Sequence, residues 1–160
     1  KRGLPNLLKH VNNIRNVYRL PCVVAINAFP TDTKAELELV EQECRKLGVN
    51  AALSEVWAKG GAGGTALAEE VVRLCEEDHS GFSFSYDLEG SIQEKLDQIV
   101  QKIYGGSRAV LTASAKKQAE QLESLGYGGC PVCVAKTQYS LSDDPSCLGA
   151  PEGFTVTVRI

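Results

Sequence analysis

Two aromatic side chains stand where α/β enzymes commonly bind ligands. Phe29 follows the apolar run Cys22–Ile26, and Trp57, the only tryptophan, follows the run Val49–Ser54. Short apolar runs bounded by turn residues predict strands, and ligands of parallel sheets bind beyond the carboxyl ends of the strands. Two aromatic faces there would hold a flat ring between them. The alternative is that Trp57 packs in the core without forming a pocket.

A glycine-rich loop follows Trp57. Residues 60–64 read Gly-Gly-Ala-Gly-Gly, and residues 61–66 match the dinucleotide pattern G-x-G-x-x-[GA]. That pattern has its first glycine at the end of the strand, whereas Trp57-Ala58-Lys59 intervene here. We therefore interpret the loop as one that lets backbone approach a ligand closely, with Gly60 and Gly61 beside Trp57. A non-catalytic module that binds a nucleotide or dinucleotide through residues 60–64 is the alternative.

Polar residues at two predicted strand ends suit the edge of a nucleotide base. Asn27 and Asp32 follow the first strand, and Lys136 and Thr137 follow a third apolar run, Pro131–Ala135. The competing interpretations are a turn former at Asn27 and a helix N-terminal carboxylate at Asp32. No G-x-x-x-x-G-K-[ST] occurs in the sequence. Any phosphate binding is therefore expected from a part that this chain lacks.

Neither a metal site nor a catalytic group can be assigned. Cys130 and Cys133 form a C-x-x-C, but it enters a predicted strand, whereas redox motifs of this type open a helix. His10 and His79 lie without ligand spacing to them, so zinc is not expected. We interpret the six cysteines as buried, reduced thiols, which favours a reducing compartment.

The elements that must position these residues alternate between strands and helices. Helical spacing, two capping boxes (Thr33–Glu36, Ser91–Glu94) and terminal glycines predict helices over residues 4–14, 33–47, 65–77, 91–104 and 113–125. Strands are predicted over residues 22–26, 49–54 and 131–135, with strand-like alternation at 82–86 and 153–160. Continuous apolar strands indicate burial on both faces. We therefore expect a three-layer α/β fold, with a mainly parallel sheet covered by helices on both faces.

Composition narrows the class of protein further. Hydrophobic residues make up 43% and charged residues 23% of the chain, as in soluble globular proteins. The net charge of −3 without a basic run argues against nucleic acid, and the longest apolar stretch is too short for a membrane. The chain begins with Lys1, contains no Met and ends in a strand-like pattern. We expect residues 1–160 to be a single α/β fragment of a larger enzyme, with a possible subdivision near 80–90.

Taken in order, these motifs resemble the formate–tetrahydrofolate ligase family over essentially the whole chain. The similar segments are Asn27–Thr33, Leu53–Gly64, Gln101–Gly105, Leu125–Gly128, Val134–Ser140 and Gly153–Arg159.

The resemblance implies a cytoplasmic ligase of one-carbon metabolism that joins formate to tetrahydrofolate with ATP, through formyl phosphate. It also implies a phosphate-loop NTPase-like fold, Mg²⁺, help from a monovalent cation and a homotetramer. ATP and Mg²⁺ would be held mainly by the absent part. Phe29 and Trp57 match the aromatic pair that stacks on the pterin, with Gly60 and Gly61 shaping that pocket. We expect this chain to be inactive without the remainder of the enzyme.

Overall fold

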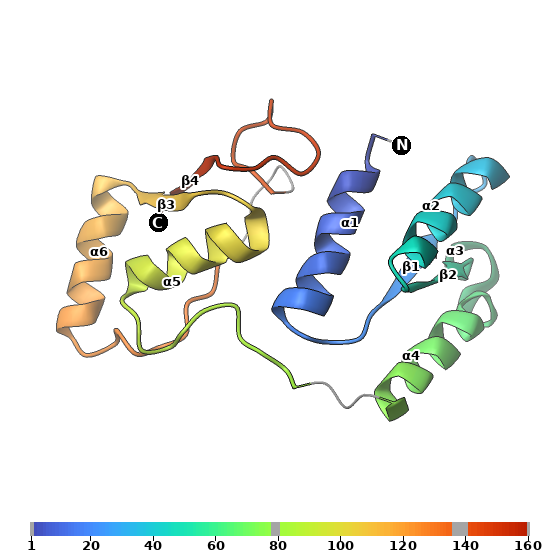
Figure 1. Cartoon of the computed structure of the whole chain (residues 1–160), viewed down its shortest axis with the longest axis horizontal. Coiled ribbons are helices and arrows are strands. Elements are labelled where there is room, and N and C mark those ends of the chain that lie inside the picture. The colour runs from blue at the N-terminus through green and yellow to red at the C-terminus, as the bar shows by residue number, and fades with distance from the viewer. Residues whose placement is uncertain (1, 78–80, 136–140, 160) are drawn as a thin grey trace. The chain divides into compact units, whose positions relative to one another are not determined.

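A computed structural model describes residues 2–77, 81–135 and 141–159 (Figure 1). The chain divides into two compact units, one comprising Lys1–Lys9 and Ser83–Ile160 and the other His10–Phe82. Helices and short parallel strands confirm the α/β class. Within the described ranges no helix combines the length and apolarity needed to cross a bilayer. The three-layer arrangement stays a prediction.

The unit His10–Phe82 is built on two parallel strands joined by a helix. Strand β1 (Val23–Asn27) pairs in register with β2 (Asn50–Ser54), so that Asn27 lies opposite Ser54. Helix α2 (Lys34–Lys46) makes the crossover, and α4 (Thr65–Glu77) follows β2 (Figure 1). The aligned strand ends direct the segments that carry Phe29 and Trp57 from the same edge of the sheet.

Helix α2 begins at the predicted capping box. Thr33 accepts a hydrogen bond from Glu36 N, and the Glu36 side chain accepts one from Thr33 N at 3.0 Å. These bonds with Thr33 hold the pKa of Glu36 below its usual value. After the helix, Gly48 adopts a φ of +66°, the left-handed conformation that glycine allows at low cost. Both predicted ends of this helix are confirmed.

Strands β1 and β2 are less buried than their apolar sequences predicted. Ala25 and Leu53 are exposed, and most of the other strand residues are only partly buried. Within the described residues each strand has one hydrogen-bonded neighbour, and α2 and α4 are the helices that pack on them. A two-stranded sheet therefore leaves apolar surface uncovered, and the prediction of strands buried on both faces is wrong here.

Glu70 ties α4 to the start of β2, and this contact predicts a pH-dependent stability. Its carboxylate accepts from Arg73 and from Asn50 Nδ2, which lower its pKa to about 2. A depressed carboxyl pKa stabilises the fold above the unfolded-state value, and this contribution disappears as the pH falls through the folded-state value. The unfolding free-energy difference between wild type and Glu70→Gln should therefore shrink from pH 5 to pH 2.

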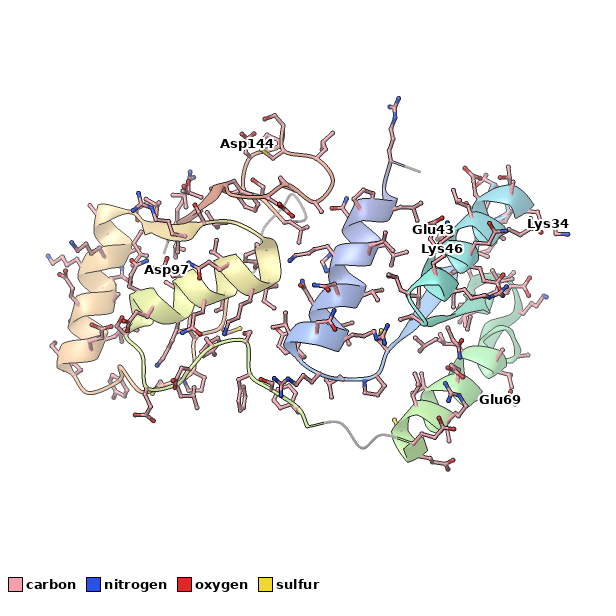
Figure 2. The ribbon with its side chains drawn as sticks, in the orientation of Figure 1. Lys34, Glu43, Lys46, Glu69, Asp97 and Asp144 are labelled. Carbon is pink, nitrogen blue, oxygen red and sulfur yellow. The ribbon has the colours of Figure 1, made fainter. Side chains whose placement is uncertain are left out.

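Urea unfolding at several pH values measures this difference. Glu69→Gln is the matched control, because it removes one negative charge from the neighbouring, exposed position of α4 (Figure 2). A wild-type advantage over Glu70→Gln that stays constant from pH 5 to pH 2 would contradict the assignment.

The other unit forms its core between a helix and a second parallel pair. Strand β3 (Arg108–Leu111) pairs with β4 (Thr155–Val158), beside α5 (Ile92–Ile99) and α6 (Ala113–Ser124) (Figure 1). The buried cluster consists of Leu96, Val100, Ala109 and Val156. In the described residues, the remaining helical segments are the α-helices α1 (Leu4–Asn12) and α3 (Val56–Lys59), the π-helices η1 (Asn13–Val17) and η3 (Val100–Tyr104), and the 3-10 helix η2 (Gly60–Gly64).

Strand β3 was not predicted, because only three apolar residues lie between the glycine pair 105–106 and the next helix. The fold fixes it through polar contacts instead. Asp97 extends from α5 toward β3 (Figure 2) and accepts a hydrogen bond from Ala109 N at 2.7 Å. Gly106 lies so close to Phe154, the residue before β4, that an added Cβ would be 2.7 Å from Phe154 O. Tight backbone packing and one carboxylate therefore position β3.

Residues 131–135 do not form the predicted strand. Val132 and Val134 pack against the core cluster, which explains their apolar character. The Tyr86 hydroxyl donates to Val132 O at 2.8 Å and accepts from Val132 N at 3.0 Å. A side chain thus takes both hydrogen-bonding positions that a neighbouring strand would use.

Residues 82–86 and the cysteines also differ from the predictions made from sequence. Residues 82–86 form no strand, and their alternation has the opposite sense, because Phe82 and Phe84 are exposed while Ser85 is buried. All six cysteines are free, but only Cys44 is buried; the exposed thiols are Cys75, Cys130 and Cys133. The C-x-x-C therefore does not consist of two core residues.

Candidate functional site

Phe29 and Trp57 form an exposed aromatic pair. Their ring centroids lie 6.5 Å apart and their planes are tilted by 49°. Phe29 is 47% exposed and Trp57 68% exposed, which contradicts the alternative that Trp57 packs in the core. A ring stacked between two others requires a spacing of about 7 Å, twice an ordinary carbon contact. Side-chain rotation of the kind common on binding would open the tilted pair to a flat ligand.

A tight turn positions Phe29. Before the turn, Ala28 N donates to Ser54 O at 3.0 Å and extends the pairing of β1 with β2 by one residue. The turn closes when Asp32 N donates to Phe29 O at 2.9 Å, with Pro30 at the second position, where its fixed φ is favourable. Phe29 N donates to Asp32 Oδ2 at 2.8 Å. The backbone of Phe29 is therefore held on both sides.

A closed loop positions Trp57. The residue lies on the one-turn helix α3, and the loop closes where Glu55 N donates to Gly63 O at 2.9 Å. Ala58 N and Lys59 N both donate to Glu55 O, while Lys59 Nζ pairs with Glu55 Oε2 at 2.6 Å. Glu55 thus organises both the helix and the loop closure around Trp57.

The glycine that the loop needs most is Gly63, which the sequence interpretation did not single out. A Cβ at Gly63 would lie 2.4 Å from Glu55 O, a distance that backbone atoms cannot relieve without moving. A Cβ at either Gly60 or Gly61 would meet nothing within 4 Å, although Gly60 has a φ of +59°. Four glycines in one loop look alike in sequence, and only the three-dimensional approach to Glu55 separates them.

A pair of alanine substitutions tests this difference. Gly63→Ala should destabilise the chain by about 2–3 kcal/mol, because the new methyl group forces the loop away from Glu55. Gly61→Ala, in open space, should change the unfolding free energy by less than about 0.5 kcal/mol. Urea unfolding of both variants measures the effects. Equal stability of the two variants would contradict the close approach at Gly63.

Of the four residues predicted to bind a nucleotide, the structure describes Asn27 and Asp32. Asn27 is exposed at the carboxyl end of β1, in the same unit as the aromatic pair. The Asp32 carboxylate accepts a hydrogen bond from the backbone N of Phe29. Lys136 and Thr137 lie outside the described residues. The structure therefore places Asn27 and Asp32 near the segment of Phe29 and leaves the other two untested.

Acidic side chains elsewhere in the described residues form no candidate metal site. Across residues 2–77, 81–135 and 141–159, no group of three or more His, Cys, Asp or Glu side chains is arranged to hold a metal ion. An open depression is lined by Asp87, Gly90, Glu94, Asp97 and Gln98. Its three carboxylates already accept backbone hydrogen bonds: Asp87 from Glu89 N, Glu94 from Ser91 N, and Asp97 from Ala109 N. The carboxylates of this depression are therefore already engaged in hydrogen bonds.

The exposed aromatic pair, its two hydrogen-bonded supports and the close-packed glycine loop are the features best suited to bind a ligand. Comparison with protein families finds that the model described as formate–tetrahydrofolate ligase matches residues 1–160.

Proposed function

Because the chain belongs to the formate–tetrahydrofolate ligase family, we propose that it supplies the surface that binds the pterin ring of tetrahydrofolate. Membership implies an enzyme that joins formate to tetrahydrofolate and uses ATP. The pterin is flat, with polar edges, so aromatic faces hold it while leaving its edges free for hydrogen bonds.

The single observation that carries this proposal is the pairing of Phe29 with Trp57. Phe29 and Trp57 are about half and two thirds exposed, so both rings are accessible to a ligand. They come from two aligned strand ends, and separate hydrogen-bonded frames support them. Ligand sites are lined mainly by hydrophobic and aromatic side chains, so a supported aromatic pair suits binding. We assign Phe29 and Trp57 as the pterin contacts, with Gly60 and Gly61 beside Trp57.

We infer that the chemical step requires residues outside this chain. The sequence contains no phosphate-loop motif. In our proposal, ATP phosphates and formyl phosphate are held by residues outside these 160, so the chain alone is inactive. Asn27, Lys136 and Thr137 remain candidates for the nucleotide edge. The three-layer sheet, the tetramer and the cytoplasmic location stay predictions.

Fluorescence of Trp57 provides the test, because this residue is the only tryptophan. Titration with tetrahydrofolate, corrected for inner-filter absorption, should give saturable quenching. NAD should give none, since α3 separates the glycine loop from the end of β2 and the dinucleotide geometry is not met. Saturable binding of NAD without binding of tetrahydrofolate would favour the nucleotide-binding module and reject our proposal.

A further inference from the structure

We propose that Asp32 is a positioning residue for tetrahydrofolate: its carboxylate fixes the backbone of Phe29, and thereby holds the Phe29 ring at the pterin face. The inference rests on the proposed function. It differs from the sequence interpretation of Asp32, in which the carboxylate binds the nucleotide.

The geometry concentrates two hydrogen bonds on one residue. Asp32 Oδ2 accepts from Phe29 N at 2.8 Å, while Asp32 N donates to Phe29 O at 2.9 Å. Both backbone polar groups of Phe29 are thus bonded to Asp32. Fixing the groups on either side of the Cα atom restricts φ and ψ, which set the direction of the Cα–Cβ bond. Asp32 therefore controls the direction in which the Phe29 side chain leaves the backbone.

The turn that carries Phe29 lies between two segments that are fixed by other hydrogen bonds. On one side Ala28 N is bonded to Ser54 O in β2. On the other side Thr33 and Glu36 form the capping box of α2. Between these anchors, the two bonds from Asp32 define the turn that carries Phe29. Loss of the side-chain bond would therefore loosen Phe29 without unfolding either β1 or α2.

Two substitutions separate positioning from a direct role of the charge. Asp32→Asn keeps an oxygen that can accept from Phe29 N, but it removes the negative charge. Asp32→Ala removes both. If Asp32 acts through Phe29, the asparagine variant should recover most of what the alanine variant loses. If the carboxylate contacts a substrate through its charge, both variants should be equally impaired.

The first measurement is amide hydrogen exchange of Phe29 in the full chain, which needs no ligand. Asp32→Ala should reduce protection of the Phe29 amide by about tenfold, the effect of losing roughly one hydrogen bond. Asp32→Asn should restore most of that protection. Equal protection in wild type and Asp32→Ala would overturn the inference, whatever the ligand data show.

The second measurement is tetrahydrofolate affinity by Trp57 quenching. Asp32→Ala should weaken binding by about tenfold, with most of the loss recovered in Asp32→Asn. Ser91→Ala, which breaks the similar capping box of α5 in the other unit, is the control for a general loss of stability and should leave the affinity unchanged. Equal weakening in the asparagine and alanine variants would overturn the positioning role in favour of a charge contact.

The measurements distinguish failure of the proposed folate binding from failure of the positioning role of Asp32. If wild type does not bind tetrahydrofolate, the proposed function of this chain fails, and Phe29 exchange alone decides whether Asp32 holds the turn. If wild type binds and Asp32→Ala binds equally well, only the positioning inference fails.

Discussion

Replacing Trp57 with alanine is expected to weaken tetrahydrofolate binding by about 100-fold while leaving the chain folded. Covering an aromatic face contributes about 1.5–3 kcal/mol through buried area and about 0.5–1.5 kcal/mol through stacking, partly offset by the ordering of the side chain. Because Trp57 is 68% exposed, its removal costs the fold little. Isothermal calorimetry measures the affinity without requiring tryptophan fluorescence.

Two variants control this experiment. Trp57→Phe keeps an aromatic face and should lose less affinity than Trp57→Ala. Phe84→Ala removes a similarly exposed aromatic side chain, 62% exposed, from the other unit and should not change binding. Wild-type affinity in Trp57→Ala would contradict the assignment of the pterin contact, and equal losses in the Trp57→Ala and Phe84→Ala variants would indicate nonspecific binding.

Replacing Lys95 with methionine is expected to destabilise the unit that contains α5 by about 3–5 kcal/mol. Lys95 is fully buried, and its ammonium group donates to Gly128 O and, at 3.0 Å, to Cys130 O. Hydrogen bonds to a charged donor contribute about 1.5–3 kcal/mol each. Methionine preserves the apolar stem but leaves two carbonyl groups without that donor. The loss is a large share of a typical domain stability of about 5–15 kcal/mol.

Urea unfolding followed by far-ultraviolet circular dichroism measures the cost. Lys117→Met is the matched control, because Lys117 is exposed on α6 and the same exchange there should cost less than about 0.5 kcal/mol. Hydrogen exchange should also become faster around residues 128–132. A cost below about 1 kcal/mol for Lys95→Met would show that water or other donors replace the ammonium group.

The sequence predicted the helices and strands that are determined by residues close to one another in the chain. Both capping boxes, at Thr33 and Ser91, were readable because donor and acceptor lie three residues apart. The parallel pairing of β1 with β2 followed from two apolar runs joined by a helix. The positions of Phe29 and Trp57 just beyond these strands followed from the same pattern. Their spatial proximity was thus a prediction from sequence that the structure supports.

Features set by distant contacts were missed. Lys95 lies on the buried face of α5, although lysine is rarely buried, because carbonyl groups more than 30 positions away complete its hydrogen bonds. Residues 131–135 have a strand-like sequence, but Tyr86 takes the backbone bonds of Val132. The sequence likewise could not show that Gly63, and not Gly60 or Gly61, touches the Glu55 backbone.

In our proposal the Phe29 and Trp57 rings contact the pterin. The most direct measurement is an NMR spectrum of the chain with tetrahydrofolate, recorded to detect intermolecular nuclear Overhauser effects to both rings. We expect contacts from the pterin protons to the Phe29 and Trp57 ring protons, and their loss in the corresponding alanine variants. Saturable binding without contacts to either ring would contradict it.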